Sequence, residues 1–115
     1  MIKLSKISEK LSSKKIMKKN MMKITSGIID TVIEKNKLYG NALFMLGEKG
    51  LFPRVYDKMN RLKFLVWDRE YDHKYTKKER IAIANAVFDI FGYMIGWIYL
   101  FIDEEIIEYL EKEVL

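Results

Sequence analysis

Two groups of side chains in this sequence have the types and spacing needed to bind a charged ligand. The first group is Asp57, Lys58 and Arg61, in which the lysine and the arginine suit phosphate groups. The second group is Asn85 and Asp89, which lie four residues apart in an apolar stretch and so share one face of a helix. A carboxylate in such surroundings is costly unless it is paired or hydrogen-bonded. We therefore expect Asp89 either to form a structural pair with Lys58 or Arg61, or to contact a metal ion or a nucleotide.

A long helix is expected to position Asn85 and Asp89. Residues Thr76 to Glu79, with the sequence TKKE, form a capping box, which marks the start of a helix. The stretch that follows is almost entirely apolar, and Gly92 and Gly96 continue the face of Asn85 and Asp89. Small residues at this spacing let another helix approach closely. A helix that is apolar on nearly all sides belongs in a core, at a subunit interface or in a membrane.

The composition favours an all-α fold. The chain has 115 residues, of which 50% are hydrophobic and 32% are charged, with one proline and no cysteine. Leu, Ile, Met, Lys and Glu dominate, and all of them are common in helices. We predict an antiparallel bundle of four to five helices. Because one small bundle would not cover the apolar helix, we also predict a homodimer or higher homo-oligomer, with Gly92, Gly96 and Trp97 near the contact.

Apolar spacing and helix-stop residues divide the middle of the chain. A helix is expected over residues 24–37, and Gly40 is well placed to end it. Residues Asn41 to Leu46 predict a short helix, which a turn at Gly47 to Gly50 would follow. Pro53 suits the first turn of the next helix.

Charge is distributed unevenly between the two ends of the chain. Residues 1–23 hold eight lysines and one glutamate, whereas residues 103–115, which predict an amphipathic helix, hold six acids and one lysine. This pattern is typical of solvated helix faces, or of attraction between opposite ends of neighbouring subunits. It does not favour nucleic-acid binding, because residues 1–23 lack a helix-turn-helix signature and interleaved aromatics. We predict a basic N-terminal arm or helix over residues 1–23 and a helical bundle domain over residues 24–115.

Several classes of site and location are excluded or disfavoured. The absence of cysteine excludes disulfides, cysteine metal sites and catalytic thiols, and it suits a reducing cytoplasm. His73 is the only histidine, which argues against His-cluster metal sites and Ser-His triads. Residues 81–102 are long enough to cross a bilayer, but Asn85 and Asp89 argue against a membrane span. We therefore expect a cytoplasmic protein.

The chain resembles a known protein family over roughly Glu34 to Phe101. The run EKNKLYGNALFMLGEKGLFPRVYDKMNRLKFL, followed by an apolar helix with FDIFGY, is similar to the nucleotide-modification-associated domain family of bacteriophages. That family has been grouped with the all-α NTP pyrophosphohydrolases, the MazG-like and dimeric dUTPase-like proteins. The matching positions are Tyr39, Gly40 and Asn41 in the first motif, Asp57, Lys58, Asn60, Arg61 and Leu62 in the second, and Asp89 and Tyr93 in the third.

The resemblance implies a nucleotide ligand and, if the protein is an enzyme, magnesium-dependent hydrolysis of an NTP to NMP and pyrophosphate. In that case Asp57 and Asp89 would hold the metal, and Lys58 and Arg61 would contact the phosphates. The other expected ligand-binding residues are Tyr39, Asn41, Asn85 and Tyr93. The chain departs from the family pattern in having Leu38 and Asn85 where aspartates are usual, and Gly92 in place of an asparagine.

Because these departures leave fewer acids to hold magnesium, whether the protein is an enzyme stays open. One alternative is a non-catalytic binder that sequesters a nucleotide signal, of the phage anti-defence type, acting in the host cytoplasm. Another is a structural helical protein that contacts a protein partner or a membrane.

Overall fold

The computed structural model describes residues 12–115, and this part of the chain is all-helical, without strands. The prediction of an all-α fold is therefore confirmed. Residues 1–11 of the predicted basic arm lie outside the described residues, and residues 14–23 form the start of the first helix. The four α-helices are α2 (Lys14–Leu38), α3 (Ala42–Leu62), α4 (Lys77–Phe101) and α5 (Glu104–Glu113), and a π-helical turn, η1 (Lys63–Trp67), extends α3.

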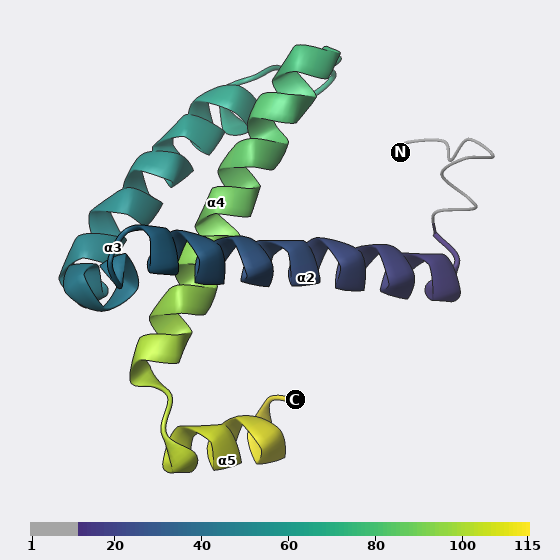
Figure 1. The fold of residues 1–115 in the computed structure, drawn as a ribbon. Coiled ribbons are helices and arrows are strands. Elements are labelled where there is room, and N and C mark those ends of the chain that lie inside the picture. Colours follow the sequence, from purple (N-terminus) through teal and green to yellow (C-terminus); the bar gives the residue numbers. More distant parts are fainter. Residues whose placement is uncertain (1–11) are drawn as a thin grey trace.

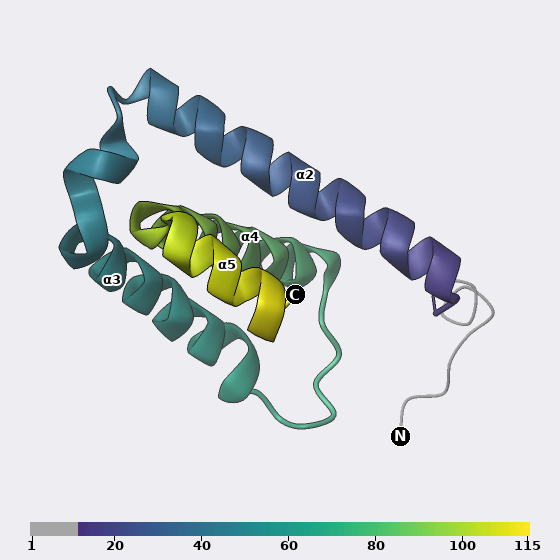
Figure 2. The same cartoon turned by 90° about the horizontal axis from the view of Figure 1, so that it is seen from below.

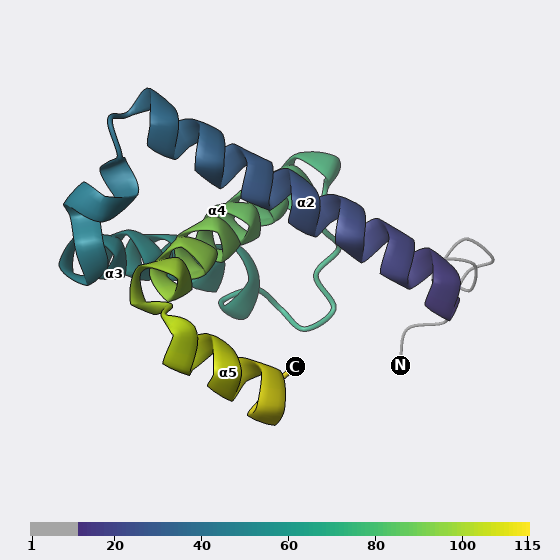
Figure 3. The same cartoon turned by 60° about the horizontal axis from the view of Figure 1, so that its bottom comes forward.

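Helix α4 is the centre of the arrangement. Helices α3 and α4 lie side by side and run in opposite directions, and α2 crosses α4 (Figure 1). The view from below shows α4 between α2 and α3 (Figure 2). Helix α5 turns from the end of α4 and runs roughly parallel to α2, set apart from it (Figure 3).

The helices begin and end where the sequence supplies caps. The side chain of Thr76 accepts from the Glu79 N–H, and Glu79 accepts from the Thr76 N–H, so the predicted capping box is confirmed. The hydroxyl of Ser13 caps α2 and the carboxylate of Asp103 caps α5. Helix α2 ends at Leu38, shortly before Gly40, which has a φ of 61°.

The expected break after Leu46 is confirmed at Gly47, but the turn does not extend to Gly50. The placement of Pro53 in a first helical turn is wrong. Helix α3 is interrupted only at Gly47, whose φ of 57° and ψ of −170° are open to glycine at little cost. The backbone is helical again from Glu48, so Pro53 lies inside the helix and not at its first turn. The N–H that Pro53 lacks would have bonded to the carbonyl of Lys49, and Lys49 is exposed to water instead.

Few side chains are buried within one chain. The buried apolar residues of the described part are Ile28, Leu51, Val55 and Ala86. Gly96 is also buried, and a Cβ added there would lie 2.6 Å from Cδ1 of Leu43.

The two glycines of α4 serve contacts within the chain. A Cβ added at Gly92 would lie 3.2 Å from Cγ2 of Val32, on α2, just as one at Gly96 would meet Leu43 of α3. These glycines therefore admit α2 and the start of α3, although we expected them at a subunit contact. Trp97, the third residue expected there, is half-buried and lies edge-on to Phe52 of α3, with ring centroids 6.4 Å apart.

One face of α4 is left uncovered by the rest of the described chain: Val87, Phe91, Met94 and Ile98 are 43–56% exposed. Among residues 12–115 it is the one helix that is long and apolar enough to cross a membrane, by length and composition alone. Only 11% of its most apolar stretch is buried.

Candidate functional site

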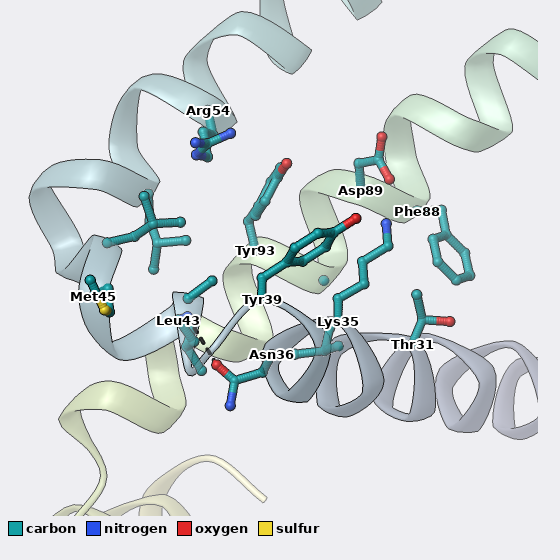
Figure 4. A pocket seen from close by; sticks show the side chains of 15 residues that line it. Thr31, Lys35, Asn36, Tyr39, Leu43, Met45, Arg54, Phe88, Asp89 and Tyr93 are labelled. Carbon is teal, nitrogen blue, oxygen red and sulfur yellow. Dashed lines mark hydrogen bonds between the residues drawn. The ribbon is translucent and has the colours of Figure 1, made fainter.

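A cavity of about 560 Å³ opens between the end of α2, the start of α3 and the middle of α4. Its volume lies within the range of small-molecule sites. Figure 4 shows its lining, which consists of Thr31, Val32, Lys35, Asn36, Tyr39, Ala42, Leu43, Met45, Leu46, Leu51, Arg54, Phe88, Asp89, Gly92 and Tyr93.

Helical spacing brings the side chains of three helices to this cavity. Lys35 lies in the last turn of α2 and Tyr39 lies four residues later, at the end of the helix, so both share one face. Asp89 and Tyr93 have the same spacing on α4. Between Asp89 and Tyr93, Gly92 has no side chain, so α2 can lie close to α4 at this point.

Asn36 joins the end of α2 to the start of α3. Its side-chain oxygen accepts a hydrogen bond of 2.9 Å from the backbone N–H of Leu43, and its amide donates to Oδ1 of Asn41 at 3.5 Å. Asn41 itself has a left-handed backbone, with a φ of 63°, which asparagine tolerates better than most residues. These bonds fix the corner of the chain that forms one wall of the cavity.

The lining of the cavity includes two cationic side chains and two tyrosine rings. Figure 4 shows that the rings of Tyr39 and Tyr93 lie between the guanidinium group of Arg54 and the ammonium group of Lys35. Two cations suit an anionic ligand group, and two aromatic rings suit a flat, apolar one. The arrangement therefore fits a molecule that carries both.

Asp89 has a partner within the chain. Nζ of Lys58 lies 3.1 Å from Oδ2 of Asp89, and the two side chains are 35% and 32% exposed. Of the two expected partners, Lys58 forms the pair, although we expected a buried pair and this one is about one third exposed. Because Asp89 also lines the cavity, its carboxylate stays accessible to a ligand.

The structure gathers only some of the predicted site residues. Tyr39, Asp89 and Tyr93 line the cavity, and Lys58 borders it through its pair with Asp89. Asn41 supports the wall without lining the cavity. The remaining three are exposed and lie outside the lining: Asp57, Arg61 and Asn85.

Sequence reasoning missed four polar residues of the lining, Thr31, Lys35, Asn36 and Arg54. A signal for Lys35 was present, because it lies one helical turn before Tyr39 and so shares its face. Arg54 lies two turns before Arg61 on the same face of α3. Their periodicity alone does not distinguish which of the two arginines faces the cavity.

The donor groups do not fit the expected magnesium site. Magnesium prefers several oxygen ligands in a compact octahedral arrangement. Among residues 12–115, no group of three or more His, Asp or Glu side chains could hold a metal ion. Asp57 lies outside the cavity, and Asp89 is paired with Lys58.

A second polar cluster lies at the start of α4 and is structural. Oε1 of Glu79 accepts from the backbone N–H of Thr76, and Oε2 lies 3.0 Å from Nε2 of His73 and 3.3 Å from Nη2 of Arg69. The Thr76 N–H, followed by the hydrogen bond with His73, lowers the pKa of Glu79 to about 2. The guanidinium group of Arg69 lies over the ring of Phe64, 5.7 Å from its centroid. This cluster holds the connection between η1 and α4 against the helix.

Comparison of the chain with protein-family models, with curated proteins and with solved structures gives no match. A functional assignment therefore rests on the side chains of the cavity and on the residues that carry the resemblance to the phage family.

Proposed function

We propose that the protein binds a nucleotide or a nucleotide-derived small molecule in the cavity between α2, α3 and α4. The observation that carries this proposal is the pair of rings, Tyr39 and Tyr93, set between the cations of Lys35 and Arg54. A base presents a flat face for the rings, and phosphates present charge for the cations. The resemblance implies the same class of ligand.

Each polar side chain has a defined role in this proposal. Arg54 donates parallel hydrogen bonds to a phosphate, and Lys35 supplies a mobile point charge. Tyr39 and Tyr93 stack on the base. The carboxylate of Asp89, which is paired with Lys58 on its other side, accepts a hydrogen bond from a sugar hydroxyl.

The cavity supports binding better than hydrolysis. A magnesium-dependent pyrophosphohydrolase needs acids that converge on the metal, and Asp57 lies outside the cavity. We therefore favour the alternative of a non-catalytic binder, which would sequester a nucleotide signal in the cytoplasm. Ligand recovered cleaved after incubation with the protein and magnesium would instead support the hydrolase.

A thermal-shift screen tests the proposal directly. The panel contains nucleotides and cyclic dinucleotides, each with and without magnesium. A ligand at 100 times its Kd stabilises the folded state by about 2.7 kcal/mol, which raises the melting temperature measurably. If no member of the panel raises it, the proposal is wrong.

Matched variants locate the binding site within the cavity. Lys35→Ala and Arg54→Ala each remove a cation from the lining, and each should weaken binding by about 10- to 100-fold, as loss of a charge-assisted hydrogen bond does. Lys37→Ala and Arg61→Ala are the controls, because they remove the same charges from the same helices outside the lining. Equal losses in all four variants would place the ligand elsewhere.

We also propose that further copies of the chain complete an antiparallel bundle, in a homodimer or higher homo-oligomer. Support comes from the small number of buried side chains and from the exposed length of α4. A membrane is a poorer cover for α4, because α3 lies along it and carries six charged side chains. Each charge taken to the bilayer centre costs about 2.5–3.5 kcal/mol on insertion scales. A monodisperse oligomer purified without detergent is the expected result, and a need for detergent would argue for the membrane.

A further inference from the structure

We propose that α5 of one copy packs against residues 14–24 of α2, here called the basic half of α2, in a second copy. This inference rests on the proposed homo-oligomer and is independent of nucleotide binding. It assigns the contact to two helical segments that the described chain leaves without a packing partner.

The basic half of α2 carries an apolar face that continues a buried one. Met17, Met21 and Ile24 follow at spacings of four and three and lie on the same side of the helix as Ile28. Ile28 is 4% exposed, whereas Met21 and Ile24 are 57% and 58% exposed. The basic half extends beyond α4 (Figure 2), so the face that α4 covers around Ile28 has no cover there. Five lysines surround it: Lys14, Lys15, Lys18, Lys19 and Lys23.

Helix α5 has the complementary surface. Ile106, Ile107, Leu110 and Val114 share one face, and no side chain of the helix is buried. Five acids surround this face: Glu104, Glu105, Glu108, Glu111 and Glu113. The Asp103 cap starts α5 independently of α4, so the helix is preformed as it projects from the end of α4 (Figures 1 and 3).

The two surfaces match in length as well as in charge. At a rise of about 1.5 Å per residue, the basic half of α2 spans about 16 Å and α5 about 15 Å. Lys14 and Lys18 lie along one edge of the apolar face of α2, and Glu111 and Glu113 lie on the two edges of that of α5. The helices can therefore pair their apolar faces and bring charges of opposite sign together.

A second copy is the occupant that this arrangement fits. Within one chain the two segments lie apart: α5 turns back at the end of α4 and runs roughly parallel to α2 without reaching it (Figures 1 and 3). If two copies exchange α5 reciprocally, each covers the basic half of the other and the assembly closes as a symmetric dimer. Both exposed apolar faces are then buried by one contact repeated twice.

Charge reversal tests the contact with little disturbance of the helices themselves. The variant Lys14→Glu with Lys18→Glu changes the start of α2, and Glu111→Lys with Glu113→Lys changes the end of α5. Acids at a helix start and lysines at a helix end are favoured by the helix dipole. Each variant alone should raise the dimer Kd on the order of tenfold or more in sedimentation or light-scattering experiments. An equimolar mixture of the two should restore a dimer, and the wild-type dimer should weaken as salt rises.

A matched control and a combined variant distinguish the outcomes. Lys77→Glu with Lys78→Glu makes the same change in net charge at the start of α4 and should leave the dimer intact. The chain that carries all four changes of α2 and α5 should form a homodimer again. A monomeric wild type, or variants that dimerise as the wild type does, would overturn the inference. A contact within one chain would also overturn the inference. In that case the combined variant would stay monomeric but be more thermally stable than either two-site variant, and the equimolar mixture of those variants would stay monomeric. Nucleotide-induced thermal shifts in the same variants report separately on the cavity.

Discussion

One apolar face of α2 is buried in the second half of the helix and exposed in the first. In the second half, Ile28 is 4% exposed, and a Cβ added at Gly92 of α4 would lie close to Val32. Met21, two turns before Ile28, is 57% exposed. Both halves space their apolar residues for one helical face, so the difference comes from what lies opposite. Helix α4 covers the second half, and no other helix of the described chain covers the first. An apolar stripe thus indicates that a face is to be buried, without saying by which element.

The largest effect is expected where the packed region is densest. Leu51 is 1% exposed, and truncation of a buried leucine costs about 2–5 kcal/mol through lost transfer energy and a cavity. Because the chain buries so few apolar side chains, we expect Leu51→Ala to remove cooperative unfolding or to lower its midpoint strongly. Circular dichroism during thermal or urea unfolding measures the change.

A leucine outside the packed region is the control for Leu51. Leu38 is 69% exposed at the end of α2, so Leu38→Ala should change the free energy of unfolding by no more than about 0.5 kcal/mol. Similar losses in both variants would mean that the exposed surface is covered in solution.

Two glycines inside helices should respond oppositely to alanine. Gly27 of α2 has no atom within 4 Å of an added Cβ, so Gly27→Ala should stabilise the protein by about 1 kcal/mol through helix propensity. At Gly96 the added Cβ would lie 2.6 Å from Leu43, and overpacking of this kind costs about 1–3 kcal/mol. The propensity gain offsets part of that cost, so Gly96→Ala should be less stable than Gly27→Ala. If the two variants are equally stable, Leu43 moves aside freely and α3 does not need the glycine.

The ends of the helices could be predicted from the sequence better than the packing of the helices against one another. The TKKE capping box and the stop at Gly40 depend on a few adjacent residues, and both were predicted correctly. The site was predicted only in part, because Arg54 and Arg61 have the same periodicity and only the placement of α2 against α4 brings Arg54 to the cavity. The wrong placement of Pro53 in a first helical turn has a different cause. A single residue with positive φ, Gly47, is enough to turn the chain, so the helix has already resumed before Pro53.

The acid that caps α4 should give the packed region a pH dependence. The pKa of Glu79 is about 2 in the folded protein, below its ordinary value of 4.5, so its stabilising contribution is complete above pH 4.5 and is lost as the pH falls toward 2. Glu79→Gln keeps the shape but removes the charge. The melting temperature of this variant should lie below that of the wild type by a constant amount above about pH 5, and the difference should narrow toward pH 2. A difference that is independent of pH would show that the capping geometry matters and the charge does not.

The smallest effect is expected for the pair Lys58–Asp89, which joins α3 to α4. Its side chains are 35% and 32% exposed, so solvent screens the attraction. Exposed ion pairs contribute about 0.2–1 kcal/mol, and a double-mutant cycle with Lys58→Ala, Asp89→Ala and the double variant should give a coupling energy in this range. The coupling should fall as salt is added. A coupling above about 2 kcal/mol would instead indicate a pair removed from water, as burial by a second copy would produce.

The same variants decide whether Asp89 acts in the cavity or only in the packing of α3 on α4. Lys58→Ala leaves the carboxylate of Asp89 in the lining, whereas Asp89→Ala removes it. If Asp89 accepts a hydrogen bond from the ligand, Asp89→Ala weakens nucleotide binding by about tenfold and Lys58→Ala changes it little. Equal losses of binding in both variants would show that the pair matters only for holding the helices together. The carboxylate would then belong to the packing of α3 on α4, and the cavity would recognise its ligand through the rings and cations alone.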